Sequence, residues 1–162
     1  TMIGDGVLLE PAKNLVVSLG IADRVTFLGA QPNEVVKRYM RNSAVFVQHS
    51  RTASDGDEEG WGVVFAEASA SCLPIVTTNH GPIPEVVLHG KTGFLCNVAD
   101  IETMAHYMSI LAGDPALRVR MGLQGREYMA DYGDLSSRVN ELYQVLLRAV
   151  QSRRDMRASP SR

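Results

Sequence analysis

The chain has little of several features that would place it in a specialised class. Its 162 residues include two cysteines and 6% aromatic residues, and the net charge is only -2. Apolar content is ordinary at 45%, and neither glycine nor proline dominates, which excludes disordered, collagen-like and coiled-coil proteins. Because the charges nearly balance, no basic face is available for nucleic acid, and we expect no nucleic-acid partner.

Long apolar runs are also missing. No stretch approaches the roughly 18 to 20 residues that cross a bilayer, and the first residues lack the basic start and apolar core of a signal peptide. These absences favour a cytoplasmic protein. Cys72 and Cys96 have no metal-ligand spacing and lie in apolar surroundings, so we expect thiols rather than a disulfide.

What the sequence does contain is an alternation of helical and strand-like segments. Strand-like runs that are apolar throughout and separated by helices are typical of a parallel sheet covered on both faces. The predicted helices are Val7–Leu19, Asn33–Met40, Gly62–Ser71 and a short one beginning near Pro84, and the predicted strands are Arg24–Gly29, Ser43–Gln48, Leu73–Thr77 and Thr92–Leu95. The fold class is therefore α/β, a Rossmann-like, three-layer, doubly wound parallel sheet.

From Ile101 onward the pattern is wholly helical, giving a helical C-terminal third. Methionines at helical spacing in this part are expected to fill the core. We predict one domain over residues 1–150 and a polar, disordered tail over 151–162. The chain opens on what resembles the end of a strand, Met2-Ile3, so we expect a first strand upstream of Thr1.

The chemistry-bearing stretch runs from a polar loop into the predicted helix at Gly62. Glu59 and Glu67 have seven residues between them, which places Glu59 just before the helix and Glu67 more than one turn inside it. Gly60 and Gly62 let the backbone approach a ligand, and a helix N-terminus attracts phosphate. A sugar attached to a phosphate offers hydroxyls to the carboxylates and anionic oxygens to the amides.

A second loop, Thr78–Glu85, also leaves a buried strand and enters a helix. In open α/β sheets ligands bind outside the carboxyl ends of the strands, so both loops are expected at one crevice. Glu67 on an apolar helix face indicates a ligand contact more than a structural ion pair. Glu85, at a helix start, is equally consistent with capping and with a diphosphate or sugar contact.

Together these segments resemble a known family. Glu59-Gly-Trp-Gly62 with Glu67, Leu73-Pro-Ile-Val, Gly81-x-x-Pro-Glu85 and Gly90-Lys-Thr-Gly-Phe-Leu95, in this order, are similar to the donor-binding half of the retaining, GT-B-fold glycosyltransferases of glycosyltransferase family 4. The resemblance covers nearly the whole chain.

The resemblance implies a donor site and a reaction. It assigns Glu59 and His80 to catalysis at the donor sugar, and Glu67 to the ribose of the nucleotide. It implies donor binding by the segment Glu59, Gly60, Trp61, Gly62, Val63 and Val64, together with Glu67, Gly81 and Glu85. The implied function is transfer of a hexose from a nucleoside diphosphate sugar to an acceptor hydroxyl, in polysaccharide or glycolipid synthesis, with no metal or other cofactor.

The same resemblance implies an incomplete enzyme. The acceptor half of the enzyme, and the lysine and arginine that neutralise the diphosphate, would precede residue 1. We therefore expect this chain alone to be inactive. Contact of the acceptor half with the inner face of the membrane stays an open alternative. Two features differ from the family's pattern. Cys72 stands where relatives commonly have glycine, and we expect this difference to affect packing only. The pair Asp55-x-Asp57 matches a metal site of another glycosyltransferase fold. The alternatives are a nucleotide-sugar epimerase of the same fold and a non-catalytic regulatory module.

Overall fold

The computed structural model describes residues 1–53, 55, 56, 58 and 62–158. Within them the chain alternates helices with short strands and then becomes helical. In order, the elements are α1 (Leu9–Ser18), α2 (Asn33–Asn42), β1 (Phe46–Gln48), α3 (Val63–Ala70), β2 (Ile75–Thr78), α4 (Ile83–Val86), β3 (Gly93–Cys96), α5 (Ile101–Gly113), α6 (Pro115–Tyr132) and α7 (Leu135–Ala158).

The three strands form one parallel sheet in the order β1-β2-β3. Phe46 is paired with Ile75 across the first ladder, and Ile75 with Gly93 across the second. All four residues of the central strand β2 are buried, as expected for a strand with a helix layer on each face. Because all three strands run the same way, the loops that follow them leave from the same edge of the sheet.

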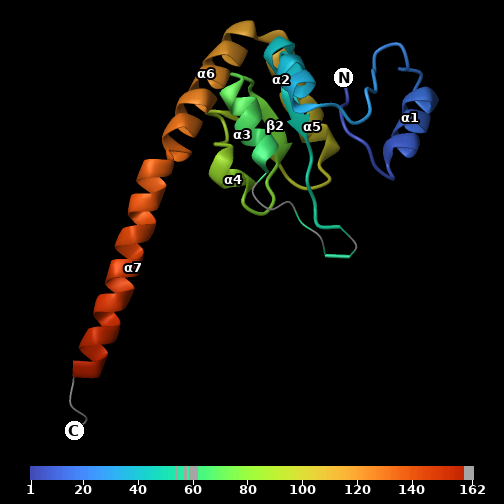
Figure 1. Cartoon of the computed structure of the whole chain (residues 1–162). Helices are drawn as coiled ribbons and strands as arrows, with labels where there is room; N and C mark the ends of the chain where they lie inside the picture. Colours follow the sequence, from blue (N-terminus) through green and yellow to red (C-terminus); the bar gives the residue numbers. More distant parts are fainter. Residues whose placement is uncertain (54, 57, 59–61, 159–162) are drawn as a thin grey trace.

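Alternate residues of the strands enter two separate cores. On one face Ile75 packs with Phe65 of α3, Val86 of α4 and Met129 of α6. On the other face Val76 packs with Leu111 of α5 and with Met121 of α6. The predicted class, a parallel α/β sheet between helical layers, is confirmed, and buried Met121 and Met129 are core residues as expected (Figure 1).

The predicted strand Arg24–Gly29 is wrong as a full strand. Phe27 forms only an isolated parallel bridge with Met2, supported by hydrogen bonds from Met2 N to Thr26 O (2.8 Å) and from Leu28 N to Met2 O (3.0 Å). Gly4, whose φ is +139°, still donates to Gly29 O (2.9 Å), but one residue out of the parallel register, so the regular ladder ends after one pair. The remaining predicted helices and strands correspond to observed elements, with boundaries shifted by a few residues.

Each helix of the C-terminal third begins at an aspartate. Asp100 Oδ1 accepts from Thr103 N (3.0 Å) and Asp114 Oδ1 from Leu117 N (2.8 Å), which are N-cap bonds of α5 and α6. Asp134 Oδ2 accepts from the amide and the hydroxyl of Ser137 at the start of α7 (2.9 and 2.6 Å). These bonds hold the pKa of Asp100 and of Asp134 below the ordinary value, since they favour the charged carboxylate.

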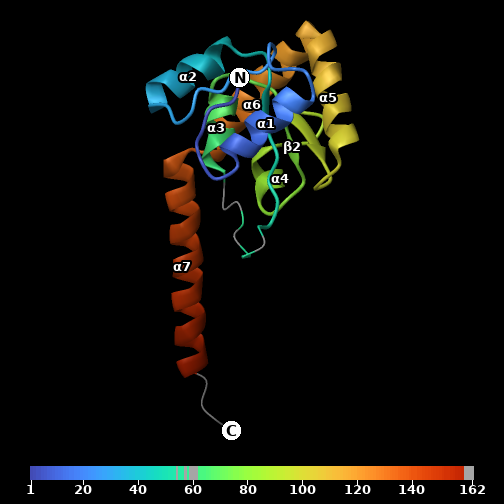
Figure 2. The ribbon, with the colours of Figure 1, turned by 90° about the vertical axis from the view of Figure 1, so that its right-hand side faces the viewer.

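Helix α7 extends away from the body formed by the other elements in both views (Figure 1, Figure 2). Its apolar residues are largely solvent-exposed, from 44% at Leu147 to 60% at Leu142. The domain boundary predicted at residue 150 falls inside this helix and stays a prediction. Among the described residues, no helix combines the length and the apolar character that crossing a membrane requires.

Both cysteines are free thiols. Cys96 is buried at the end of β3, and burial raises the pKa of its thiol. Cys72 is half-buried and has a φ of +57°, in the left-handed region that favours glycine. The expectation that Cys72 affects packing only is therefore wrong, because its side chain stands on a backbone conformation that is unfavourable for any residue except glycine.

Candidate functional site

The loops after β1 and β2 are joined at the carboxyl edge of the sheet. Ser50 N donates to Thr78 Oγ1 (2.9 Å), and Thr78 Oγ1 donates to Ser50 O (2.7 Å), with both residues buried. Asn79 N donates to Cys96 O (2.7 Å), which ties the same loop to the end of β3. These bonds bring the two loops together at one edge of the sheet, and the ligand crevice expected between them stays a prediction.

The N-terminus of α3 lies at this edge and presents free backbone donors. Gly62 precedes the helix with a φ of +68° and no side-chain cap, and Val63 is 63% exposed. Among the described residues the amides of Val63 and Val64 have no hydrogen-bond acceptor, as expected for the first positions of a helix. Two unsatisfied N–H groups and the positive end of the helix dipole make this terminus suitable for an anion.

A glycine is required at position 62 for two reasons. Its φ lies in the left-handed region, and a Cβ there would come within 2.4 Å of Phe65 Cδ2, part of a fully buried ring. The Phe65 amide closes the first turn by donating to Gly62 O (2.8 Å). The glycine predicted to let the backbone approach a ligand is therefore also the residue that allows α3 to start where it does.

Glu67 lies one turn inside α3 and is half-buried. In the described part of the chain its carboxylate has neither a hydrogen bond nor an ion pair. The ion pairs found there are Lys13–Glu10, Lys37–Glu34 and Arg138–Glu141, all on single helices. The structural ion pair that competed with ligand binding as an explanation of Glu67 is thus not found among these residues.

His80 is contacted from the loop after β1. Its Nε2 lies 3.1 Å from Thr52 Oγ1, and that hydroxyl donates to Glu58 Oε1 at 2.6 Å. The other ring nitrogen, Nδ1, is shielded from solvent and has no hydrogen-bond partner among the described residues. The next residue, Gly81, is exposed with a φ of +49°, so the chain turns sharply beside the ring.

Glu85 does not cap its own helix, since α4 has no side-chain cap. Instead the Glu85 carboxylate accepts from Tyr132 OH at 3.3 Å, and Glu85 O accepts from Tyr128 OH at 2.7 Å. Burial raises the pKa of Tyr128, which keeps the phenol protonated as a donor. The Arg138 guanidinium lies 4.3 Å from the centre of the Tyr132 ring. Glu85 thus ties α4 to α6, whatever else it binds.

Several sequence predictions lie outside the described residues. Glu59, Gly60 and Trp61 belong to this group, as does Asp57 of the aspartate pair. In the part that is described, no group of three or more histidine, cysteine or acidic side chains could hold a metal ion. The catalytic role of Glu59 and the absence of a metal stay predictions.

The residues that sequence reasoning missed are Thr52, Tyr128 and Tyr132. Thr52 was treated only as part of a polar loop, and both tyrosines belong to a helix whose spacing indicated core packing. No local pattern marks them, because each reaches its partner across at least 28 residues of sequence.

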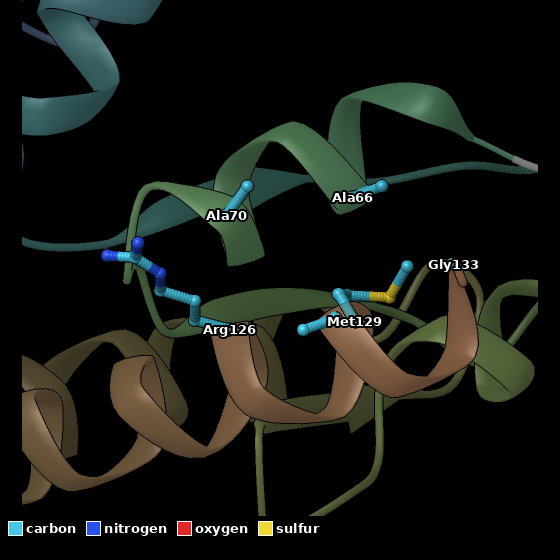
Figure 3. A pocket seen from close by; sticks show the side chains of 6 residues that line it. Ala66, Ala70, Arg126, Met129 and Gly133 are labelled. Atoms are coloured by element: carbon cyan, nitrogen blue, oxygen red, sulfur yellow. The ribbon is translucent and has the colours of Figure 1, made fainter. Parts of the chain in front are cut away.

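A cavity of about 370 Å³ lies behind this edge, between α3 and α6 (Figure 3). Ala66 and Ala70 face it from α3, and Arg126 and Met129 face it from α6. Its lining is almost entirely apolar, and none of the predicted site residues contributes to it. Apart from Arg126, the cavity therefore offers a sugar nucleotide no polar side chain, and the candidate site remains the carboxyl edge of the sheet.

Parallel strands between helical layers, with loops converging at the carboxyl edge, define a Rossmann-like domain. A sequence model of the family described as glycosyl transferases group 1 matches residues 1–128. The chain belongs to this family.

Among similar proteins is the GDP-mannose-dependent alpha-(1-6)-phosphatidylinositol monomannoside mannosyltransferase of Mycolicibacterium smegmatis, 33% identical over 90% of this chain and 38% of the relative. The N-acetyl-alpha-D-glucosaminyl L-malate synthase of Bacillus anthracis is 36% identical over 78% of this chain and 31% of that protein. The chain thus spans about a third of the length of these relatives.

Solved structures agree on the fold. The sucrose-phosphate synthase of Thermosynechococcus elongatus superimposes with a TM-score of 0.70 at 26% identity, covering 86% of this chain and 34% of that one. Anabaena Alr3699/HepE in complex with UDP gives a TM-score of 0.74 at 22% identity, covering 89% of this chain and 39% of that one.

Proposed function

We propose that the chain is the donor-binding domain of a retaining glycosyltransferase that transfers a hexose from a nucleoside diphosphate sugar to an acceptor hydroxyl. The observation that carries the proposal is the pairing of Glu67 with the N-terminus of α3. A half-buried carboxylate without a partner among the described residues lies one turn from two free amides. Unsatisfied acceptors beside unsatisfied donors suit a ligand that has both hydroxyls and phosphates.

Each group has a distinct role in this proposal. The amides of Val63 and Val64 bind the diphosphate and, with the helix dipole, stabilise the charge that develops on it as the sugar departs. Glu67 accepts hydrogen bonds from the ribose hydroxyls, and Glu59, outside the described residues, binds the sugar hydroxyls. His80 and Gly81 lie beside the sugar. These fixed dipoles act without a metal ion.

The names of the relatives support this class of donor. The mycobacterial relative is named as a GDP-mannose-dependent mannosyltransferase, and the Bacillus anthracis relative as an N-acetyl-alpha-D-glucosaminyl L-malate synthase. Since these relatives are more than twice as long as this chain, we propose that the acceptor binds to a separate domain, and that the 162 residues alone transfer nothing.

The test is a calorimetric titration of the chain with UDP, GDP and ADP. At least one nucleotide should bind, and Glu67→Gln should lower its affinity roughly 10- to 100-fold. This is the effect of losing a hydrogen bond to a charged group, which contributes about 1.5–3 kcal/mol. Glu127→Gln, at an exposed site on α6, is the matched control and should bind like the wild type. Absence of binding at millimolar nucleotide would instead support a non-catalytic module.

Catalysis is tested separately. Turnover of a sugar nucleotide by the isolated chain in the presence of acceptor alcohols should not exceed background. Turnover above background would contradict the proposal that the acceptor binds to a separate domain. An epimerised sugar nucleotide, formed without an acceptor by the chain joined to its acceptor-binding half, would support the epimerase.

A further inference from the structure

The His80 ring lies between two anchored loops. Ser50 and Thr78 are joined by two buried hydrogen bonds, and Thr52 and His80 each follow two residues later on their loops. Because β1 and β2 are parallel, both loops leave the sheet in the same direction and bring the Thr52 hydroxyl to the ring. The contact is therefore fixed by the sheet, and not only by a chance approach of two exposed side chains.

The short bond from Thr52 to Glu58 decides which partner donates. A threonine hydroxyl has one proton, and at 2.6 Å from a carboxylate oxygen that proton belongs to the charge-assisted bond to Glu58. The same oxygen can then act toward His80 only as an acceptor. The 3.1 Å contact is thus a bond from His80 Nε2–H to Thr52 Oγ1.

The other nitrogen of the ring is left without a partner. His80 Nδ1 is shielded from solvent and has no hydrogen bond to any described residue. A proton on Nδ1 in place of Nε2 would leave a buried donor without an acceptor there, which costs more than an unpaired lone pair. The neutral ring therefore has its proton on Nε2.

We propose that Thr52 and Glu58 are positioning residues for His80: they fix its Nε2–H tautomer and the orientation of the ring that the proposed function places beside the donor sugar. The sugar as ligand rests on the function proposed above, whereas the tautomer does not. The acidic loop before α3 thereby acquires a role beyond solvation, since Glu58 acts on His80 through the Thr52 hydroxyl.

The tautomer is tested without ligand, by long-range ¹H–¹⁵N correlation spectra of the ¹⁵N-labelled chain about two pH units above the ordinary histidine pKa. His80→Gln identifies the ring among the four histidines. The wild type and Thr52→Ser, which keeps the hydroxyl, should show the Nε2–H pattern, and Thr52→Val should show averaging of the two tautomers. An Nδ1–H pattern in the wild type, or an unchanged pattern in Thr52→Val, would overturn the proposal.

The sugar contact is tested by titrating UDP-glucose and GDP-mannose beside UDP and GDP. Thr52→Val should lower the affinity for the sugar nucleotide about three- to tenfold more than the affinity for the nucleotide alone. Thr26→Val, at an exposed threonine elsewhere, should change neither affinity. Equal weakening of both would overturn the contact with the sugar. If no nucleotide binds the wild type, the function proposed above fails, and the spectra still decide the positioning role.

Discussion

Replacing Gly122 by alanine is expected to separate α3 from α6. A Cβ at this position would lie 1.9 Å from Cys72 O and 2.7 Å from Cys72 C, where 3.4 Å is the near limit of ordinary contact. The obstacle is backbone, so no side chain can rotate out of the way. Either α6 or the turn at Cys72 must move by roughly 1 Å or more in a close-packed interior.

The magnitude follows from two opposing terms. Overpacking of this kind costs about 1–3 kcal/mol and occasionally more, whereas alanine in place of glycine favours a helix by about 1 kcal/mol. Because the clash is with backbone, we place the first term at its upper end and expect a net loss of about 2 kcal/mol in the free energy of unfolding. With a typical urea dependence, the midpoint falls by roughly 1 M.

The same helix supplies the control. At Gly125 an added Cβ would meet Ser69 Oγ at 3.5 Å, an ordinary contact, and at Gly113 at the end of α5 it would meet nothing within 4 Å. Gly125→Ala and Gly113→Ala should therefore be as stable as the wild type or slightly more so. Urea unfolding followed by circular dichroism at 222 nm compares all three variants.

The refuting result is a Gly122→Ala midpoint equal to that of Gly125→Ala. It would mean that α3 and α6 are packed loosely enough to absorb the extra carbon. A fall of equal size in both variants would refute the reasoning differently, by showing that α6 needs glycines for a reason other than the contact with Cys72.

Three further predictions use other features of the fold. Gly62→Ala should lower stability by about 1–3 kcal/mol in thermal unfolding, because its Cβ would lie 2.4 Å from the Phe65 ring at a φ of +68°, and an unchanged melting temperature would count against it. Cys72→Gly should raise the free energy of unfolding in urea by about 1 kcal/mol by relieving the left-handed backbone, and a decrease would show that thiol burial outweighs the strain. Asp100 and Asp134 have a lowered pKa in the folded state. Their contribution to the free energy of unfolding is therefore fully present above the ordinary aspartate pKa, and it is lost as the pH falls through the folded-state pKa. Asp100→Asn and Asp134→Asn keep a capping side chain without that titration, so each variant should be less stable than the wild type at neutral pH, and the difference should narrow as the pH falls, measured by urea unfolding followed by circular dichroism at each pH.

Much of the fold could be predicted from local pattern. Apolar strands between helical stretches indicated the parallel sheet, and the helical spacing after Ile101 indicated the C-terminal third. The exception was Arg24–Gly29, where β-branched and aromatic residues favoured a strand. A strand needs a partner that stays in register, and here the register slips by one residue at Gly4, whose amide donates to Gly29 O.

The candidate site could be predicted only in outline. The order of glycines and glutamates around Gly62 pointed to the start of α3, and the free amides and half-buried Glu67 are found there. The contacts that hold the site were not predictable, because Thr52 meets His80 and Tyr132 meets Glu85 across the fold. Their roles depend on hydrogen bonds between elements that local spacing does not relate.

The sequence by itself determined the fold class and the family, and it predicted which loop faces a ligand, since periodicity and motif order are local properties of the chain. Only the tertiary structure decided that Cys72 has a left-handed backbone, that Glu85 does not cap its helix, and that Thr52 contacts the His80 ring. Each of these depends on atoms brought together by the packing of α3, α4 and α6 on the sheet. Distances of a few ångströms between such atoms, and not residue type, determine which group donates, which accepts and which is left for a ligand.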